Sequence, residues 1–129
     1  MSPSECPFCQ PDSKRIWFLD ETGIVVRDAF PVSKGHTLVV PRQHTASLFD
    51  LPAATQSALW RLVAEARTRL HDELHPDGFN LGLNDGEAAG QTVMHAHIHV
   101  IPRWTGDVPD PRGGIRWVIP DKARYWENE

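Results

Sequence analysis

The sequence predicts an α+β fold in which an antiparallel sheet of about five strands packs against one main helix. Short runs of apolar and β-branched residues recur along the chain, between turns that contain Gly or Pro. One longer segment instead repeats its apolar residues at every third or fourth position, which is the period of a helix. The chain has 129 residues, no internal repeat and no long linker, so residues 1–129 are expected to form a single domain.

Three strands are expected in the first third of the chain. The runs "RIWFLD" (15–20) and "GIVVRD" (23–28) are separated only by a short turn, which is typical of a β-hairpin. The run "GHTLVVP" (35–41) follows the turn "PVSKG" and is the third candidate.

The next segment has the pattern of one amphipathic helix. Its expected buried face consists of Leu59, Leu62, Val63, Ala66, Leu70 and Leu74. Asp50 is expected to cap the start of this helix, and Pro52 suits a first turn because its missing N–H is not needed there. The sequence "HPDG" (75–78) is expected to end the helix.

Two more strands are expected at "FNLGLN" (79–84) and "VMHAHIHVIP" (93–102), joined by the Gly-rich loop "DGEAAGQT" (85–92). From about residue 104 the chain is rich in Pro, Gly and Trp, which predicts an irregular tail. Such a tail could cover the domain or contact another subunit.

Charge and hydropathy exclude several classes of partner. The net charge is −4 and the acidic residues are spread along the chain, so neither nucleic acid nor an anionic membrane is an expected partner. No apolar run approaches the length of a membrane-spanning helix, and "MSPSECPFCQ" lacks the basic flank and apolar stretch of a secretion signal. A cytoplasmic location is therefore expected.

A row of three histidines at alternate positions, His95, His97 and His99, is the most informative feature of the sequence. Alternate side chains of a strand share one face, so these imidazoles are expected to stand together. The opposite face is expected to pack through Met94, Ala96, Ile98 and Val100. Such a row can be a solvated face, a metal site or a source of nucleophilic imidazole, and the spacing alone does not separate the last two.

The residues around the row resemble those of the histidine triad (HIT) family. The stretch "GQTVMHAHIHVIPR" (90–103) is similar to the family signature at nearly every position, and the similarity extends to "FPVSKGHTLVVPRQH" and "NLGLNDGEAAGQT". The resemblance implies a HIT-like fold and a nucleotide hydrolase or nucleotidyl transferase. It also implies that His97 attacks the α-phosphorus of a nucleotide, with adenosine as the expected nucleoside, to form a covalent nucleotidyl-histidine that water or a second acceptor then resolves.

Neighbouring polar residues are expected to assist this reaction. His99 is placed to contact the phosphate or the leaving group, and Gln91 and Thr92, with the amides of their loop, can donate to the phosphate oxygens. By resemblance, Asp28 binds the ribose hydroxyls and Asn84 reaches the ribose and phosphate. If the resemblance is set aside, Asp28 could simply begin a turn, and the "NDG" at Asn84 is itself a strong turn signal.

The pair Cys6 and Cys9 in "CPFC" could be a redox motif, a metal half-site or two reduced thiols. The redox interpretation is weak because Pro11 follows closely and no apolar helical period continues from the pair. A zinc site needs two more ligands. The resemblance supplies them as His44 and His95 and implies a structural Zn²⁺, with no organic cofactor. His36 is expected to support the pocket.

Two other features favour structural interpretations. The sequence "HDELH" (71–75) looks like a zinc-protease helix, but Asp72 stands where that motif needs Glu, so a surface role is expected. Trp104, Trp117 and Trp126 could stack on a base or close a dimer, although aromatic residues in a tail more often serve packing.

Several functions remain open within these expectations. "PRWTGD" (102–107) resembles the dinucleoside polyphosphate hydrolases of the family, whereas the zinc pair and Asp28 are more like the branch that cleaves adenosine phosphoramidates. The alternatives to an enzyme are a catalytically silent nucleotide-binding module and a zinc-stabilised interaction protein. The resemblance also implies a homodimer, with a small nucleotide as the other partner.

Overall fold

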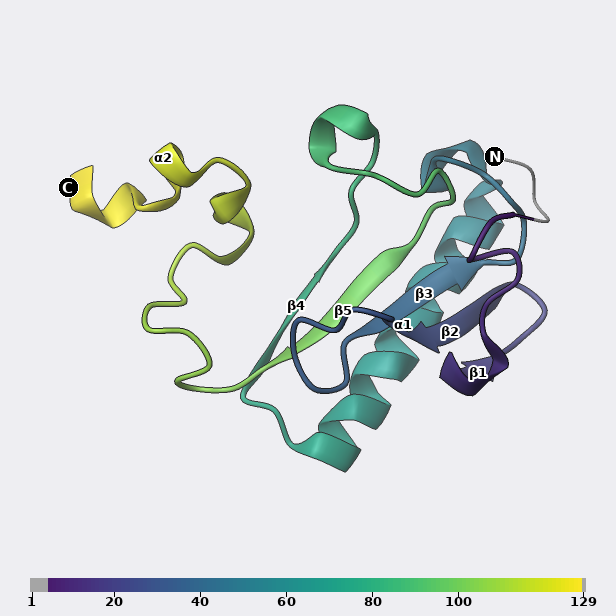
Figure 1. Ribbon diagram of the computed structural model, residues 1–129, viewed down its shortest axis with the longest axis horizontal. Coiled ribbons are helices and arrows are strands. Elements are labelled where there is room, and N and C mark those ends of the chain that lie inside the picture. Colours follow the sequence, from purple (N-terminus) through teal and green to yellow (C-terminus); the bar gives the residue numbers. More distant parts are fainter. Residues whose placement is uncertain (1–4, 129) are drawn as a thin grey trace.

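The computed structural model describes residues 5–128, and one long helix lies across one face of a five-stranded antiparallel sheet (Figure 1). The strands lie in the order β1-β2-β3-β5-β4. Their bounds are Ile16–Leu19 for β1, Gly23–Arg27 for β2, Thr37–Pro41 for β3, Gly78–Gly82 for β4 and Ile98–Arg103 for β5, and the helix α1 spans Ala53–Leu74. The expected α+β class, with about five strands and one main helix, is confirmed.

The pairing of β3 with β5 fixes the position of the histidine row. Leu38 of β3 lies opposite His99 of β5, and Val39 lies opposite Ile98. Residues directly opposite in an antiparallel pair share a face of the sheet. His99 is therefore on the face of Leu38, whereas Ile98 is on the face of Val39.

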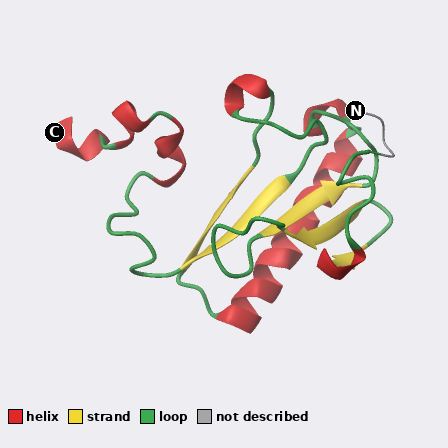
Figure 2. Ribbon diagram, in the orientation of Figure 1, coloured by secondary structure: helices red, strands yellow, loops and turns green. Residues whose placement is uncertain are grey.

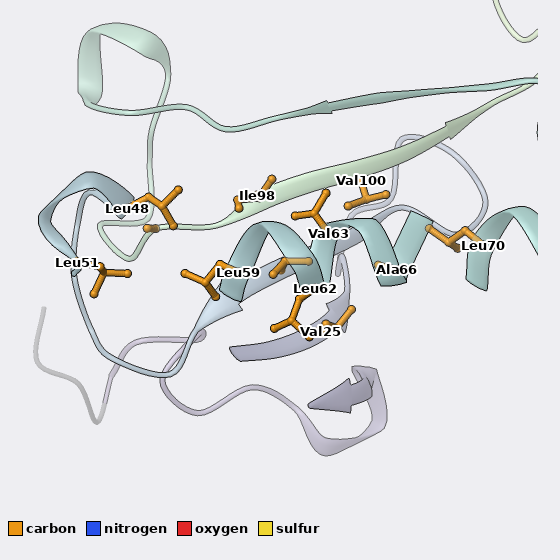
Figure 3. Packing of buried hydrophobic residues seen from close by; sticks show 12 residues of the cluster. Val25, Leu48, Leu51, Leu59, Leu62, Val63, Ala66, Leu70, Ile98 and Val100 are labelled. Atoms are coloured by element: carbon orange, nitrogen blue, oxygen red, sulfur yellow. The ribbon is translucent and has the colours of Figure 1, made fainter. Parts of the chain in front are cut away.

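The main core lies between α1 and the face of the sheet that carries Val39 (Figure 3). The helix contributes Leu59, Leu62, Val63, Ala66 and Leu70, and the strands contribute Val25, Val39, Ile98 and Val100. This is the apolar face expected from the helical period of the sequence. A second, smaller cluster on the opposite face consists of Ile24, Val26, Leu38 and Val40, with Phe8 and Ile16 packed against it. His99 shares this second face with Leu38.

The two ends of α1 differ in how well they were predicted. Asp50 does not cap the helix: it lies in a separate 3₁₀ turn, Leu48–Asp50, whose own cap is Ser47, and the residue before α1 is Pro52, with no side-chain cap. The expected end is confirmed, because His75 adopts a left-handed conformation with φ of 51° and its N–H bonds the carbonyl of His71.

Strand β5 begins later than expected, at Ile98, so His95 and His97 lie in the irregular segment before it. The Ala96 N–H donates to the carbonyl of Thr45 at 2.7 Å, in the loop after β3, which holds the segment close to that loop. Ala96 still points into the core and His95 is fully buried. The expectation for Met94 is wrong, since its side chain is exposed.

Beyond β5 the tail extends past the edge strand β4, which it approaches at Gly114 and Ile115, and through residue 128 it contains short helical segments at Gly114–Val118, Pro120–Ala123 (α2) and Tyr125–Asn128 (Figures 1 and 2). Arginine–aromatic stacking holds it together: Arg112 lies 4.2 Å from the Trp126 ring centre, and Arg116 lies 4.8 Å from that of Tyr125. Within residues 5–128, no helix is both long and apolar enough to cross a membrane.

Candidate functional site

Two cysteines and two histidines from three distant segments meet at one point. Cys6 and Cys9 come from the N-terminal turn, His44 follows β3, and His95 precedes β5. Their ligand atoms all lie within 4.8 Å of one another. The Nδ1 atom of His44 is 3.0 Å from the Cys9 sulfur and 3.1 Å from Nδ1 of His95. The structure thus brings together all four residues expected to bind zinc.

The chemistry of this cluster fits a Cys₂His₂ zinc site. The Nε2–H of His95 donates to the carbonyl of Pro41 at 2.8 Å, which leaves the Nδ1 lone pair directed at the sulfurs, 3.4 Å from Cys6. Burial lowers the pKa of His95, so this ring is neutral and able to ligate. Burial and the neighbouring Cys6 raise the pKa of the Cys9 thiol, and a bound cation would stabilise both thiolates. Four protein ligands leave no open position, as in structural zinc sites.

The ring of His97 is oriented by a backbone oxygen. Its Nδ1 lies 2.8 Å from the carbonyl oxygen of His95. A carbonyl can only accept, so Nδ1 carries the proton and the lone pair of the neutral ring is on Nε2. Nε2 is the atom able to attack an electrophile.

His36 and His99 form a hydrogen-bonded chain with a defined direction. The Val32 N–H donates to Nδ1 of His36 at 3.1 Å, so neutral His36 carries its proton on Nε2. That proton is donated to Nδ1 of His99 at 2.9 Å, which leaves the proton of neutral His99 on its own Nε2. Burial, with lesser contributions from His97 and His36, lowers the pKa of His99 to about 4. His99 is thus a neutral donor near pH 7.

The same chain argues against a second metal site. Atoms of Asp28, His36 and His99 also lie within 4.8 Å of one another. A metal would need a lone pair on Nε2 of His36, where the hydrogen bond from Val32 places a proton. One oxygen of Asp28 accepts from the Phe30 N–H at 2.8 Å, and the other lies 3.5 Å from Nε2 of His36. One oxygen of Asp28 therefore supports a turn, while the side chain also faces the pocket.

A cavity of about 380 Å³ lies over these histidines on the sheet face opposite α1. Its polar lining includes five of the residues expected at the site: Asp28, Asn84, Thr92, His97 and His99. Its apolar lining includes Pro7, Phe8, Val26, Phe30 and Leu38. The cavity is of the size and mixed polarity that suit a small organic ligand.

Phe8 is a site residue that the sequence reasoning missed. Its ring centre lies 4.8 Å from that of His97 and 6.0 Å from that of His95. The available signal was its position between Cys6 and Cys9, since a residue between two ligands of one cluster must lie close to that cluster.

Gln91 is placed differently from the expectation that it faces the phosphate. Its Oε1 accepts from the Gly86 N–H at 2.8 Å, and its Nε2 donates to the carbonyls of Ala46 and Val93. The side chain is buried and does not line the cavity. In this structure Gln91 braces the loop that presents Thr92.

A wider groove of about 1410 Å³ separates the tail from β4 and β5, and it shares Asn84, Gly90 and His99 with the smaller cavity. Trp104 and Trp117 line this groove, whereas Trp126 stacks with Arg112. The "HDELH" histidines lie at the end of α1, where His71 pairs only with its neighbour Asp72 at 3.4 Å among the described residues. The surface interpretation of that motif agrees with this position.

A Cys₂His₂ cluster beside a histidine-lined cavity, on the open face of a five-stranded antiparallel sheet, defines the class of histidine triad proteins. The chain belongs to the HIT domain family, whose model matches residues 11–106. The resemblance drawn from the sequence is confirmed.

Similar proteins include one named only as HIT-like and two named as enzymes. A HIT-like protein of Mycoplasma pneumoniae is 38% identical over 85 residues, 66% of this chain and 59% of the relative. An AP-4-A phosphorylase of Mycobacterium tuberculosis is 34% identical over 108 residues, 76% of this chain and 55% of that protein. The adenylylsulfatase HINT3 of Arabidopsis thaliana is 33% identical over 106 residues, 78% of this chain and 53% of that protein. The chain thus spans little more than half the length of these relatives.

Solved structures share the fold along most of the chain. A zinc-bound histidine triad family protein from Mycobacterium smegmatis has a TM-score of 0.74 and 34% identity, covering 99% of this chain and 100% of the other. A histidine triad nucleotide-binding protein from Sulfolobus tokodaii has a TM-score of 0.74 and 35% identity, covering 81% of this chain and 73% of the other. The fold is that of a nucleotide-binding family with enzyme members.

Proposed function

We propose that this chain is a nucleotide hydrolase or nucleotidyl transferase that works through a covalent nucleotidyl-histidine at His97. The observation that carries the proposal is the hydrogen bond from Nδ1 of His97 to the carbonyl of His95, 2.8 Å long. It leaves the Nε2 lone pair free in a cavity that also holds Asp28, Asn84 and His99. A neutral imidazole held in one tautomer is an effective nucleophile near pH 7.

The reaction takes place in two displacements. Nε2 of His97 attacks the α-phosphorus of an adenosine nucleotide, and the bond from phosphorus to the leaving group breaks while Nε2–H of neutral His99 donates a hydrogen bond to that group, which takes up its proton from water. The positive charge on the His97 ring is stabilised by the His95 carbonyl. A water molecule then attacks phosphorus and loses a proton to the solvent, which breaks the P–N bond and releases the nucleoside monophosphate.

The cavity offers a place for each part of the nucleotide. Phe8, Val26 and Leu38 form an apolar wall suited to the base. The free oxygen of Asp28 can accept from ribose hydroxyls, and Asn84 and Thr92 can donate to the ribose and phosphate. These phosphate donors are neutral, which suits a chain with a net charge of −4.

Cys6, Cys9, His44 and His95 would hold a Zn²⁺ ion, which the zinc-bound relative from Mycobacterium smegmatis supports. The metal would join the N-terminal turn to the segments after β3 and before β5 and stabilise the fold. The catalytic groups are the ring atoms of His97 and His99, with Gln91 as a positioning residue that supports their loop.

Two substrate classes are compatible with the site, dinucleoside polyphosphates and adenosine phosphoramidates. The names of two relatives, an AP-4-A phosphorylase and an adenylylsulfatase, both describe cleavage of adenylylated compounds. The "PRWTGD" turn gives a slight preference for polyphosphates. The adenylyl-enzyme is common to every one of these substrates.

A panel of adenylylated compounds tests the proposal, with AMP release and the intact mass of the protein measured together. We expect AMP release from at least one compound and a transient adenylyl adduct on the wild-type chain. The His97→Ala variant should bind AMP but neither form the adduct nor turn over. Near-normal turnover by His97→Ala would refute the role of His97. Binding without turnover by the wild type would instead favour the catalytically silent alternative.

We further propose that the single domain 1–129 forms a homodimer. Within residues 5–128, β4 is an edge strand that pairs only with β5, and large apolar side chains of the tail, among them Ile115, Val118 and Ile119, are exposed. An open strand edge and exposed apolar groups are both features that a second subunit covers. Light scattering with size-exclusion chromatography should give twice the chain mass, and a monomer at micromolar concentration would contradict this.

A further inference from the structure

We propose that Phe8 couples the metal site to the nucleotide pocket, so that metal binding and nucleotide binding strengthen one another. The coupling requires a nucleotide in the pocket and so rests on the proposed function. It goes further by giving a role to a residue that is neither a metal ligand nor a reacting group.

Phe8 provides the first physical link between the two sites. It lies between Cys6 and Cys9 in the sequence, so its backbone position is set by the same turn that brings both sulfurs to His44 and His95. Its side chain lines the nucleotide pocket, and its ring centre is 4.8 Å from that of His97. A shift of this turn therefore moves one wall of the pocket and the packing of the nucleophile together.

The turn that carries Phe8 has little support other than the cluster itself. Residues 5–12 contain no strand or helix, and the backbone bond from Gln10 N–H to the Cys6 carbonyl, 3.2 Å long, closes the turn. Phe8 is half-buried against the sheet cluster that includes Val26 and Leu38. A metal bound to both sulfurs would fix this turn in place.

His95 provides the second link. Its side chain directs Nδ1 at the sulfurs, while its backbone oxygen accepts the hydrogen bond from Nδ1 of His97. The orientation of the nucleophile thus depends on a residue that the metal would hold. Both links therefore reach the His97 ring, one through the Phe8 ring at 4.8 Å between centres and one through the hydrogen bond at Nδ1.

Coupling between two binding events is reciprocal. If the metal orders the wall that contacts the nucleotide, then a bound nucleotide must strengthen metal binding by the same free energy. This consequence can be measured without turnover, because AMP, a product of the proposed reaction, occupies the pocket without reacting further.

The test is the fraction of zinc that zinc-loaded protein releases at equilibrium to a competing chromogenic chelator, with and without saturating AMP. In the wild type we expect AMP to lower the Kd for zinc obtained from this competition at least about fivefold, the lower end of ordinary couplings between sites. In Phe8→Ala the effect of AMP should be lost, even at AMP concentrations that saturate the variant by equilibrium dialysis. Phe8→Leu, which keeps an apolar side chain, should show a reduced effect and serves if Phe8→Ala does not fold.

Phe30→Ala is the matched control. Phe30 lines the same pocket but is 86% exposed and lies outside the cysteine turn. Its truncation is expected to leave the effect of saturating AMP on zinc release intact. An equal loss in Phe30→Ala and Phe8→Ala would overturn the specific role of Phe8.

The remaining outcomes separate this inference from the proposed function. If AMP binds the wild type but does not change zinc release, the coupling is refuted and the proposed function stands. If AMP does not bind the wild type at all, both are refuted. A chain that retains no zinc after reconstitution would also overturn the coupling.

Discussion

Nδ1 of His97 lies 2.8 Å from the backbone oxygen of His95, the residue whose own ring faces the cysteine pair. His95 and His97 are therefore connected by a hydrogen bond from the side chain of His97 to the backbone of His95. The third member, His99, is connected instead to His36, at 2.9 Å. Three histidines that look equivalent in the sequence have three different sets of partners.

The His99→Ala variant tests the hydrogen bond to the leaving group. We expect it to slow cleavage of an AMP amide by about 10²–10³-fold, because one donor to the negative charge that develops on the leaving group is removed. Cleavage of the p-nitrophenyl ester of AMP should be affected much less, since nitrophenolate leaves readily without such a donor. Pre-steady-state release of the two leaving groups measures this difference. Equal losses for both substrates would show that His99 does not assist the leaving group.

The Asp28→Asn variant tests ribose binding. The variant can still accept the Phe30 N–H and so keep the turn. It should bind AMP about tenfold or more weakly, because a hydrogen bond to a charged group contributes about 1.5–3 kcal/mol. Calorimetry with 2′,3′-dideoxy-AMP is the control, since that ligand should bind both proteins equally. A matching loss for the dideoxy ligand would assign Asp28 to the structure of the pocket.

The Gln91→Ala variant tests whether this side chain braces the loop. Truncation leaves the Gly86 N–H and two carbonyls without their partner, so the free energy of unfolding should fall by about 1–3 kcal/mol. Urea unfolding measures the loss. The exposed neighbour provides the control, as Thr92→Ala should change stability by only about 0.5 kcal/mol. An unchanged stability in Gln91→Ala would favour the original expectation of a phosphate contact.

The buried histidines predict how stability depends on pH. Burial lowers the pKa values of His36 and His99, the latter from 6.5 to about 4, so the unfolded chain takes up these protons first as the pH falls. Their contribution is fully present above pH 6.5 and is lost between pH 6.5 and about 4. Over this window the wild type should lose about 1–2 kcal/mol more than His99→Gln, measured by urea unfolding.

The exposed histidine of the helix end gives the matched control for this comparison. His71 has a side chain that is 53% exposed, so His71→Gln should follow the wild type across the same pH range. If His99→Gln and His71→Gln both followed the wild type, the proposed burial of a neutral His99 would be wrong.

The parts of the structure predicted from the sequence are those with a periodic or paired pattern. The helical repeat from Leu59 to Leu74 and the alternation from Ala96 to Val100 each follow from one element burying one face. The histidine row predicts a polar cluster because neighbours two apart share a face, and the meeting of His44 with the cysteines followed from family resemblance alone.

The parts that were missed depend on which tertiary partner is available. Asp50 has the chemistry of a helix cap, but Ser47 starts a separate turn that includes it. Gln91 has donors suited to a phosphate, but the backbone carbonyls of Ala46 and Val93 take them up. The sequence gives no expectation for Phe8, because its place in the pocket depends on how the cysteine turn meets His97. In each case the residue type indicates which interactions the side chain can make. The group that it actually contacts depends on segments distant in the sequence or on a competing turn.

The stereochemical course at phosphorus tests the central claim most directly. A substrate with a chiral phosphorothioate at the α-position would be cleaved by the wild-type protein in isotopically labelled water, and the configuration of the product would be determined by NMR. Two in-line displacements through Nε2 of His97 predict overall retention. Inversion would mean that water attacks the α-phosphorus directly, and it would contradict the covalent role assigned to His97.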